Sequence, residues 1–264
     1  MEKKSYNPKY PVQTLEKALD IIEIFFKESD SRGLGISDLD KKLNMGKSTI
    51  HRILDTLAAY NYVEKCEGNT RYRLGWKLYE IGNVVPRHRN IFQCDYGILQ
   101  ELCNLYKETV NLGVRVDSDV ITIAKFEPAT TLMANLQIGS REPLYATAMG
   151  KMLISQFDRT KILEILGEEK FKSYTPNTIT NLDDLLVELE KIKKQGYSID
   201  VEESCLGLCC IAMPIQNYKK EIVSAVSVSG PSVRLNFNKI MDVKEGLAEA
   251  TGLLSGYLGY KDAI

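Results

Sequence analysis

The sequence predicts an α+β protein in two parts: an N-terminal winged helix-turn-helix and a C-terminal antiparallel sheet with helices. Two helical stretches flank a tight turn between residues 36 and 57, and a hairpin pattern follows at 60–74. From residue 109 onward, apolar and polar residues alternate as in strands, with helical periodicity between them. We therefore expect a DNA-binding domain at 1–75, a linker helix at 76–89 and a second domain at 90–264.

The second helix of the 36–57 stretch has a divided surface. At about 100° per residue, Ile50, Ile53 and Leu54 share one flank. The other flank carries hydrogen-bonding side chains, namely Lys47, Ser48, Thr49, His51 and Arg52. Such a helix fits the DNA major groove, where side chains contact base edges. An ordinary amphipathic surface helix shows the same division, so the interpretation depends on the neighbouring segments.

Those neighbours complete a winged helix-turn-helix. A helix expected at 14–27 brings a set of apolar side chains to one side: Leu15, Ala18, Leu19, Ile22, Phe25 and Phe26. Residues 60–74 predict a hairpin that turns at Glu67-Gly68-Asn69. The hairpin has basic side chains, and we expect Arg71 to contact the phosphate backbone.

Charge is unevenly placed along the 264 residues. Residues 1–90 hold 16 Lys and Arg against 12 Asp and Glu, whereas residues 91–264 hold 18 against 23. A modestly basic N-terminal part followed by an acidic C-terminal part is typical of a nucleic-acid-binding domain joined to a domain with a different function.

Several classes of protein are disfavoured by composition. No run approaches 18 apolar residues and the first ten residues contain no secretory core, so we expect a cytoplasmic protein without a membrane segment. Six irregularly spaced cysteines do not form a disulfide framework. With two histidines and no Cys-x-x-Cys pair, we expect no metal site.

The middle of the chain predicts two helices. Residues 75–85 suit one helix, which Pro86 should interrupt because proline disfavours helix in the preceding residue. A second helix is expected at about 90–108. It would either pair two subunits or pack on its own domain.

The C-terminal part alternates strands and helices. Strands are expected at 110–116, 120–126, 197–201, 208–214 and 222–229. Helices are expected at 149–156, 159–166, 182–195 and from about 236. We expect the helices to cover one face of the sheet, which leaves the other face as a pocket floor.

Small side chains gather on that floor. Strand alternation places Ser227 with Ser229, and Leu208 with Cys210, on common faces. Ala148, Met149 and Gly150 open a helix, and a helix start favours an anion. Further wall candidates are Ala134 and Leu136.

Motifs spread over nearly the whole chain resemble the IclR family of bacterial transcription regulators. In the front part these are residues 14–22, 47–53 and 72–75. In the rear part they are residues 139–151, 174–180, 196–200, 210–212 and 226–231. Gly46 departs from the family, which often has proline at the first position of this helix.

The resemblance implies a ligand-responsive, sequence-specific DNA-binding repressor or activator of a catabolic operon. Its C-terminal domain would be GAF/PAS-like and would sense a small organic acid or sugar-acid-like metabolite. Asp200 matches an acidic family position and would accept a hydrogen bond from a ligand hydroxyl. The partners would be a pseudo-palindromic double-stranded operator and further copies of the chain, as a homodimer or dimer of dimers. We expect no cofactor besides the effector, a carboxylate.

Two enzyme-like patterns lack a necessary part. Gly46-Lys-Ser-Thr49 resembles the end of a phosphate-binding loop, but Lys41 stands where the first glycine is required. Adjacent Cys209 and Cys210 suggest redox or nucleophilic chemistry, but neither histidine lies in that domain to act as a base. We therefore expect no catalytic residues, and the floor of small residues disfavours a purely scaffolding protein.

Overall fold

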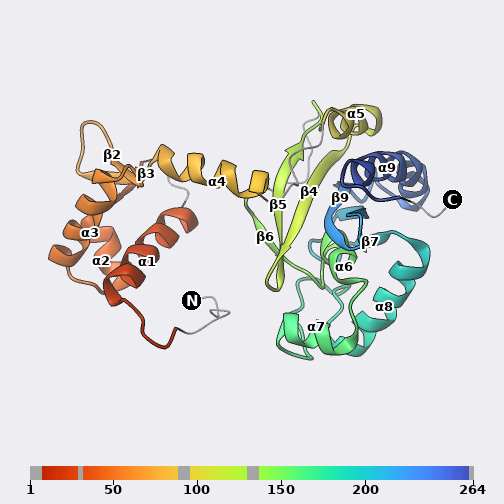
Figure 1. The fold of residues 1–264 in the computed structure, drawn as a ribbon, viewed down its shortest axis with the longest axis horizontal. Coiled ribbons are helices and arrows are strands. Elements are labelled where there is room, and N and C mark those ends of the chain that lie inside the picture. The colour runs from red at the N-terminus through yellow and green to blue at the C-terminus, as the bar shows by residue number, and fades with distance from the viewer. Residues whose placement is uncertain (1–7, 29–31, 89–95, 130–136, 262–264) are drawn as a thin grey trace. The chain divides into compact units, whose positions relative to one another are not determined.

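The computed structural model describes residues 8–28, 32–88, 96–129 and 137–261. Contacts divide the chain into two compact units, Met1–Phe92 and Gln93–Ile264, and each is described here by itself (Figure 1). No helix in these ranges is long and apolar enough to cross a bilayer.

The first unit contains a helix-turn-helix and a small antiparallel sheet in the order β1-β3-β2. Its elements are α1 (Gln13–Lys27), β1 (Leu34–Gly35), α2 (Ile36–Leu43), α3 (Lys47–Ala59), β2 (Val63–Lys65), β3 (Arg71–Leu74) and α4 (Trp76–His88). Val63 lies opposite Leu74 and Lys65 opposite Tyr72, so the predicted hairpin is confirmed. The two-residue strand β1 was not predicted.

Three helices and the wing share one core. Its buried members are Ile21, Phe25, Leu34, Leu39, Ile50, Ile53, Leu54, Val63 and Tyr72. The predicted apolar flank of α3 is therefore confirmed. The predicted face of α1 is wrong in part, because Leu15, Leu19 and Phe26 are 58%, 52% and 57% exposed. Phe25 was predicted correctly, but apolar residues cover two adjacent flanks of α1, and periodicity alone did not show that Ile21 also faces the core.

The turn between α2 and α3 requires a glycine. Gly46 is the N-cap of α3, with φ +71° and ψ 134°, and its N–H donates to Oδ1 of Asp40 at 3.2 Å. Proline fixes φ near −65° and has no N–H to donate, so it could not replace glycine in this turn. The chain therefore has glycine rather than proline at this position because the turn before α3 has a different backbone geometry.

Helix α4 continues through Pro86 to His88, so the predicted interruption at that residue is wrong. A proline inside a helix removes one hydrogen bond, and its φ is itself helical, so the helix can continue. The second predicted helix appears as α5 (Gly97–Tyr106), and its predicted first residues lie outside the described ranges.

The second unit is built on a six-stranded antiparallel sheet in the order β6-β5-β4-β9-β8-β7. Its strands are β4 (Thr109–Val116), β5 (Asp119–Phe126), β6 (Arg141–Pro143), β7 (Ser198–Val201), β8 (Leu208–Gln216) and β9 (Ile222–Pro231). Its other helices are α6 (Ala148–Ile154), α7 (Arg159–Leu166), α8 (Leu182–Gln195) and α9 (Phe237–Tyr257). All the predicted strands are present, and β6 was missed.

Helices cover both faces of this sheet, so the expectation of one covered face is wrong. Helices α5 and α9 pack against Val226 and Val228 on one face. On the opposite face, helices α6, α7 and α8 form a second core with Cys210, Ala212 and Ala225. Neighbouring residues of β8 and β9 therefore belong to two separate cores.

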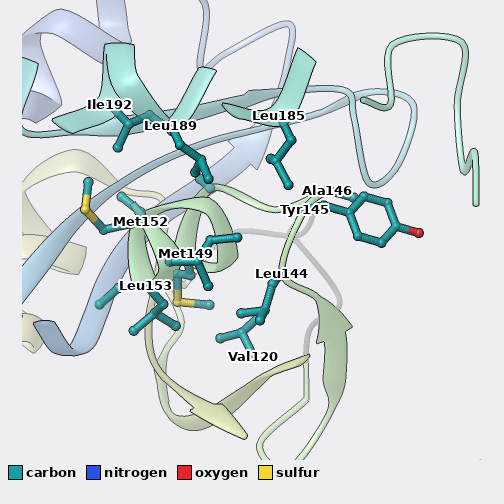
Figure 2. Packing of buried hydrophobic residues seen from close by; sticks show 14 of the residues in the cluster. Val120, Leu144, Tyr145, Ala146, Met149, Met152, Leu153, Leu185, Leu189 and Ile192 are labelled. Atoms are coloured by element: carbon teal, nitrogen blue, oxygen red, sulfur yellow. The ribbon is translucent and has the colours of Figure 1, made fainter. Parts of the chain in front are cut away.

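The core on the α6 side is shown in Figure 2. Leu185, Leu189 and Ile192 extend from α8 toward Met149 and Met152 of α6. Helix α6 thus lies between α8 and the sheet, and every residue of α6 is buried. Any pocket on this face must be formed between α6 and the strands.

Candidate functional site

The polar flank of α3 is accessible in the first unit. Lys47, Ser48, His51 and Arg52 are exposed and Thr49 is half-buried, while the opposite flank is in the core. No described residue forms an ion pair with Lys47 or Arg52. The five side chains of α3 that were predicted to contact DNA thus lie on the accessible part of this helix, where Thr49 and Arg52 also line a surface hollow beside α1.

The wing is tied to α2 through Arg71. Its Nη2 lies 2.8 Å from Oδ2 of Asp38 and its Nη1 donates to the carbonyl oxygen of Gly33 at 3.0 Å. The same Oδ2 of Asp38 accepts the N–H of Gly35 at 3.0 Å. Arg71 therefore uses two of its five N–H donors within the domain, which gives it a structural role, and its contact with phosphate stays a prediction.

Other cations of the wing differ in their partners. The Nε of Arg73 donates to Oε1 of Glu64 across the hairpin at 2.5 Å. This exposed pair raises the pKa of Arg73. Lys65 is exposed, and within the described ranges it has no ion-pair partner. The charge of Lys65 is therefore available for a partner outside the domain.

A small pocket lies between α6 and the sheet of the second unit. It is lined by Glu142, Thr147, Ala148, Met149, Asp200, Ser204, Leu208, Cys210 and Ser227. The lining encloses about 10 Å³, roughly the space for one water molecule. A metabolite of several heavy atoms fits only if the lining side chains separate.

Six of the predicted effector-binding residues line this pocket: Ala148, Met149, Asp200, Leu208, Cys210 and Ser227. Gly150 does not, because it packs against the backbone of Leu144, where a Cβ would lie 2.4 Å from the carbonyl oxygen. Ser229 is fully buried behind the lining. Ala134 and Leu136 lie outside the described residues.

The sheet supplies a polar floor behind the lining. Asn111 lies opposite Ser227 in the register, and its Nδ2 donates to Oγ of Ser229 at 2.9 Å and Oγ of Ser227 at 3.5 Å. Asn111 thus fixes both serine oxygens as acceptors, which leaves the hydroxyl proton of Ser227 able to point into the pocket. Asn111 was not predicted from the sequence, because its position opposite Ser227 depends on the pairing of β4 with β9.

Asp200 is fully buried and already holds two hydrogen bonds. Its Oδ1 accepts the N–H of Glu203 at 2.7 Å, and its Oδ2 accepts the hydroxyl of Ser204 at 2.8 Å. Burial raises its pKa, although these two donors and the charge of Lys151 act in the opposite direction. Each carboxylate oxygen retains a lone pair for a ligand donor.

A buried ion pair lies beside Asp200. Nζ of Lys151, which is 1% exposed, lies 2.5 Å from Oε1 of Glu203. Burial raises the pKa of Glu203 to about 7, and the Lys151 ammonium opposes that rise. The positive charge of Lys151 is therefore already matched by Glu203 and is not free for an anionic ligand.

Glu142, Thr147 and Ser204 line the pocket but were not predicted. Thr147 caps α6, since its Oγ1 accepts the N–H of Gly150 at 3.0 Å. Burial, with a smaller effect from the charge of Asp200, raises the pKa of Glu142 to about 7. Glu142 lies on a three-residue strand, which is too short to show a periodic pattern, so only its place in the family-like stretch 139–151 pointed to it.

Cys210 is a wall of the pocket rather than a reactive thiol. It is buried, and burial together with the charges of Asp200 and Glu142 raises its pKa well above the ordinary value. The thiolate is the nucleophilic form of cysteine, so this side chain reacts poorly at neutral pH. Within the described ranges, no group of three or more His, Cys, Asp or Glu side chains is arranged to hold a metal ion.

Comparison with known proteins gives two family matches that together span most of the chain. Residues 84–255 match the family described as bacterial transcriptional regulator IclR C-terminal. Residues 14–66 match the IclR helix-turn-helix domain. Both parts of the chain therefore resemble the corresponding parts of the same regulators.

Full-length relatives agree with these matches. The HTH-type transcriptional regulator XynR of Escherichia coli is 32% identical over 249 residues, which are 94% of this chain and 98% of that protein. The regulator KdgR of E. coli is 31% identical, with 94% and 95% covered. The crystal structure of Thermotoga maritima IclR superposes with a TM-score of 0.79 at 31% identity, covering 94% of this chain and 99% of that one.

Proposed function

Because the chain belongs to the IclR family of bacterial transcriptional regulators, we propose that it controls a catabolic operon in response to a small organic acid. The α3 face would bind a specific operator, and the pocket between α6 and the sheet would bind the acid. The observation that carries this proposal is the accessible polar flank of α3, whose apolar flank is fixed in the core.

Side chains of two kinds would hold the DNA. Arg52, near the middle of α3, would donate to a base edge, as a guanidinium does with guanine in the major groove. Lys47 and Lys65 would contact phosphates, which position the protein without reading sequence. Arg71 would support the wing through its contact with Asp38, and its exposed part would contact phosphate.

The pocket would hold an acid in a fixed orientation. The first residues of α6, Ala148 and Met149, line it, and no described residue accepts a hydrogen bond from their N–H groups. These N–H groups and the Ser227 hydroxyl would donate to the ligand carboxylate. Asp200 would accept from a ligand hydroxyl at the opposite end.

Ligand response requires unequal affinity for two conformations of the protein. The pocket lining encloses about 10 Å³, so a ligand would bind only conformations in which α6 and the sheet lie further apart. In a dimer, this preference would change how two DNA-binding domains are presented to the operator. Two-fold symmetry would require a pseudo-palindromic operator.

Operator binding by the Arg52→Ala variant tests the DNA-reading proposal. We expect affinity for the specific operator to fall by about 1–3 kcal/mol, with little change on unrelated DNA. Titration at fixed salt measures both values. Lys194→Ala, which removes an exposed cation from α8 in the other unit, is the control and should bind like the wild type. Unchanged operator affinity for Arg52→Ala would exclude the base-reading role.

A thermal-shift screen tests the ligand proposal. Selective ligands stabilise the native state in proportion to the logarithm of their concentration over Kd. We expect small organic or sugar acids, but not the corresponding amides, to raise the unfolding temperature. Equal shifts with acids and amides would contradict a carboxylate-binding pocket.

A further inference from the structure

Asp200, the proposed acceptor of the pocket, is oriented by the turn that follows β7. The N–H of Glu203 donates to its Oδ1 at 2.7 Å, and the hydroxyl of Ser204 donates to its Oδ2 at 2.8 Å. Glu202 in this turn has a left-handed φ of +57°, which residues other than glycine adopt only when the surrounding structure requires it. The direction of the Asp200 carboxylate therefore depends on what holds the backbone of residues 202–204.

Two buried threonines hold this turn from one side. Oγ1 of Thr175 donates to the carbonyl oxygen of Glu202 at 2.6 Å. Oγ1 of Thr178 donates to the carbonyl oxygen of Glu203, also at 2.6 Å. These contacts fix the backbone of the turn, but they do not connect it to α6.

Lys151 makes that connection. Its side chain is 1% exposed, and its Nζ lies 2.5 Å from Oε1 of Glu203. The other oxygen of that carboxylate, Oε2, is buried and has no hydrogen-bond partner among the described residues. Burial and the charges of Asp200 and Glu188 disfavour an ionised Glu203, and the Lys151 ammonium opposes them. Lys151 therefore holds Glu203 at a place from which two other carboxylates would repel it.

A second contact attaches β7 to the same helix, because the buried hydroxyl of Ser198 donates to the carbonyl oxygen of Ala148 at 2.5 Å. The end of β7 and the turn after it are thus joined to α6 at two positions. If α6 moved away alone, the Lys151 ammonium would lose its partner in a buried place, which is strongly unfavourable. Movement of the turn together with α6 avoids that loss.

We propose that Lys151 is a positioning residue, which acts through Glu203 to hold the Asp200 carboxylate toward the pocket and to make this carboxylate follow α6. The proposal rests on the function proposed above for the role of Asp200 as an acceptor. A buried ion pair is often no more stabilising than well-packed apolar side chains. Its contribution here is orientation, because a charged hydrogen bond fixes the direction of a contact and an apolar pair does not.

The test follows two signals of the full-length chain without a ligand. Carbon-13 NMR measures the titration of the Asp200 carboxyl group, which is assigned by its loss in Asp200→Asn. Hydrogen exchange measures the opening of the N–H at position 203.

The main variant combines Lys151→Met with Glu203→Gln, so that both charges of the pair are removed and neither is left buried alone. We expect the N–H at position 203 to exchange about 10-fold faster, as for the loss of one hydrogen bond. The pKa of Asp200 should rise, because the two donors that favour its ionised form no longer stay in place. Exchange within α6 and β9 should remain as in the wild type.

Two further variants separate position from charge. Glu203→Gln alone keeps an oxygen that accepts from Lys151, so the N–H at position 203 should stay protected. Lys161→Met with Glu164→Gln removes an exposed ion pair from α7 and should behave like the wild type. An unfolding temperature for each variant confirms that it is folded.

The outcomes distinguish this proposal from the sensing function. Wild-type exchange at position 203 in the main variant would overturn it, even with a raised pKa of Asp200, since that pKa alone reports charge. Faster exchange throughout the second unit would also overturn it, because the pair would then stabilise the whole domain. Neither result affects the sensing function, which fails instead if the thermal-shift screen finds no acid that binds.

Discussion

Arg71 shows how one side chain can join three segments that are distant in sequence. Its guanidinium contacts the carboxylate of Asp38 on α2 and the backbone of Gly33 before β1, while its own backbone belongs to β3. Asp38 in turn accepts the N–H of Gly35 at the start of α2. The wing and the helix-turn-helix are therefore linked through polar contacts as well as through the core.

Replacement of Arg71 by alanine should act mainly on stability. The pair with Asp38 is about one-third exposed, so solvent screens it, and we expect a loss of about 1–2 kcal/mol in the unfolding free energy of the first unit. Lys65→Ala should leave stability unchanged and reduce the salt dependence of DNA binding by about one unit of slope. Urea unfolding and salt-dependent titration of both variants measure these effects. A stable Arg71→Ala variant with the reduced slope would restore the phosphate role to Arg71.

The raised pKa of Glu142 has a consequence for stability. Burial raises it to about 7 from an ordinary value of 4.5, so the folded protein holds this proton more tightly than the unfolded chain does. The stability that protonated Glu142 contributes to the folded state is therefore fully present below about pH 4.5 and is lost as pH rises to about 7.

The unfolding temperature of the second unit should consequently be higher at about pH 5 than at about pH 8. Glu142→Gln has no proton to lose and should show a smaller difference between these conditions. Glu203, whose pKa is also raised to about 7, should preserve part of the pH dependence of the unfolding temperature in this variant. An identical pH dependence in the variant and the wild type would mean that Glu142 is solvated.

At the residue scale, sequence reasoning found side chains that follow a periodic pattern. Alternation along two long strands located Leu208, Cys210 and Ser227, and all three line the pocket. It could not find Glu142 or the partner of Arg71, because both depend on contacts between segments far apart in the chain.

Gly150 allows helix α6 to pack closely against its preceding loop, because glycine has no side chain. Gly150 approaches Leu144 so closely that a Cβ would lie 2.4 Å from its carbonyl oxygen and 2.5 Å from its Cα. Both of these are backbone atoms, which cannot turn aside as the end of a side chain can. Glycine therefore sets the position of α6, and with it one wall of the pocket.

Gly150→Ala should destabilise the second unit by about 1–3 kcal/mol, because the added methyl group forces α6 or the loop to shift. Gly252→Ala is the matched control, since no atom lies within 4 Å of its Cβ position in α9. There the loss of backbone freedom in the unfolded chain should stabilise the protein by about 0.5–1 kcal/mol. Chemical denaturation compares the two, and equal effects would mean that α6 adjusts freely.

Helices whose ends are marked by N-capping residues and C-terminal glycines were predicted most accurately. Helices α7 and α8 begin and end at the predicted residues, because Asp158 and Asn181 cap their first turns and Gly167 and Gly196 end them in left-handed conformations. The buried face of α1 and the existence of β6 depended on what packs against them. Local sequence carries no record of those partners.

For the whole molecule, the proposed function requires communication between the two units. The pocket lies in the second unit, and the proposed DNA-binding face lies in the first. A ligand that binds both conformations equally would change nothing, so control depends on a difference in affinity. The order of the two domains followed from sequence periodicity, whereas the direction of the response depends on energies that periodicity does not contain.

Ser227→Leu should separate ligand response from DNA binding. Ser227 is 2% exposed in the pocket lining, and leucine, which is larger than the space for one water molecule there, would block the pocket and push its lining apart. We expect operator affinity like that of the wild type and no change when the acid is added. Full ligand response in this variant would mean that the effector binds elsewhere, and the wild-type-like operator affinity serves as the internal control.

The alternation of β8 and β9 between two cores has an evolutionary consequence. Residues 210, 212, 225 and 227 face α6, whereas residues 209, 211, 226 and 228 face α5 and α9. In the proposed mechanism, mutations at the members of the first set that line the pocket would alter which metabolite is accepted, while the second set would continue to hold the fold together. A gene of this kind could thus acquire a new inducer by stepwise changes at every other codon of two strands, without passing through an unfolded intermediate.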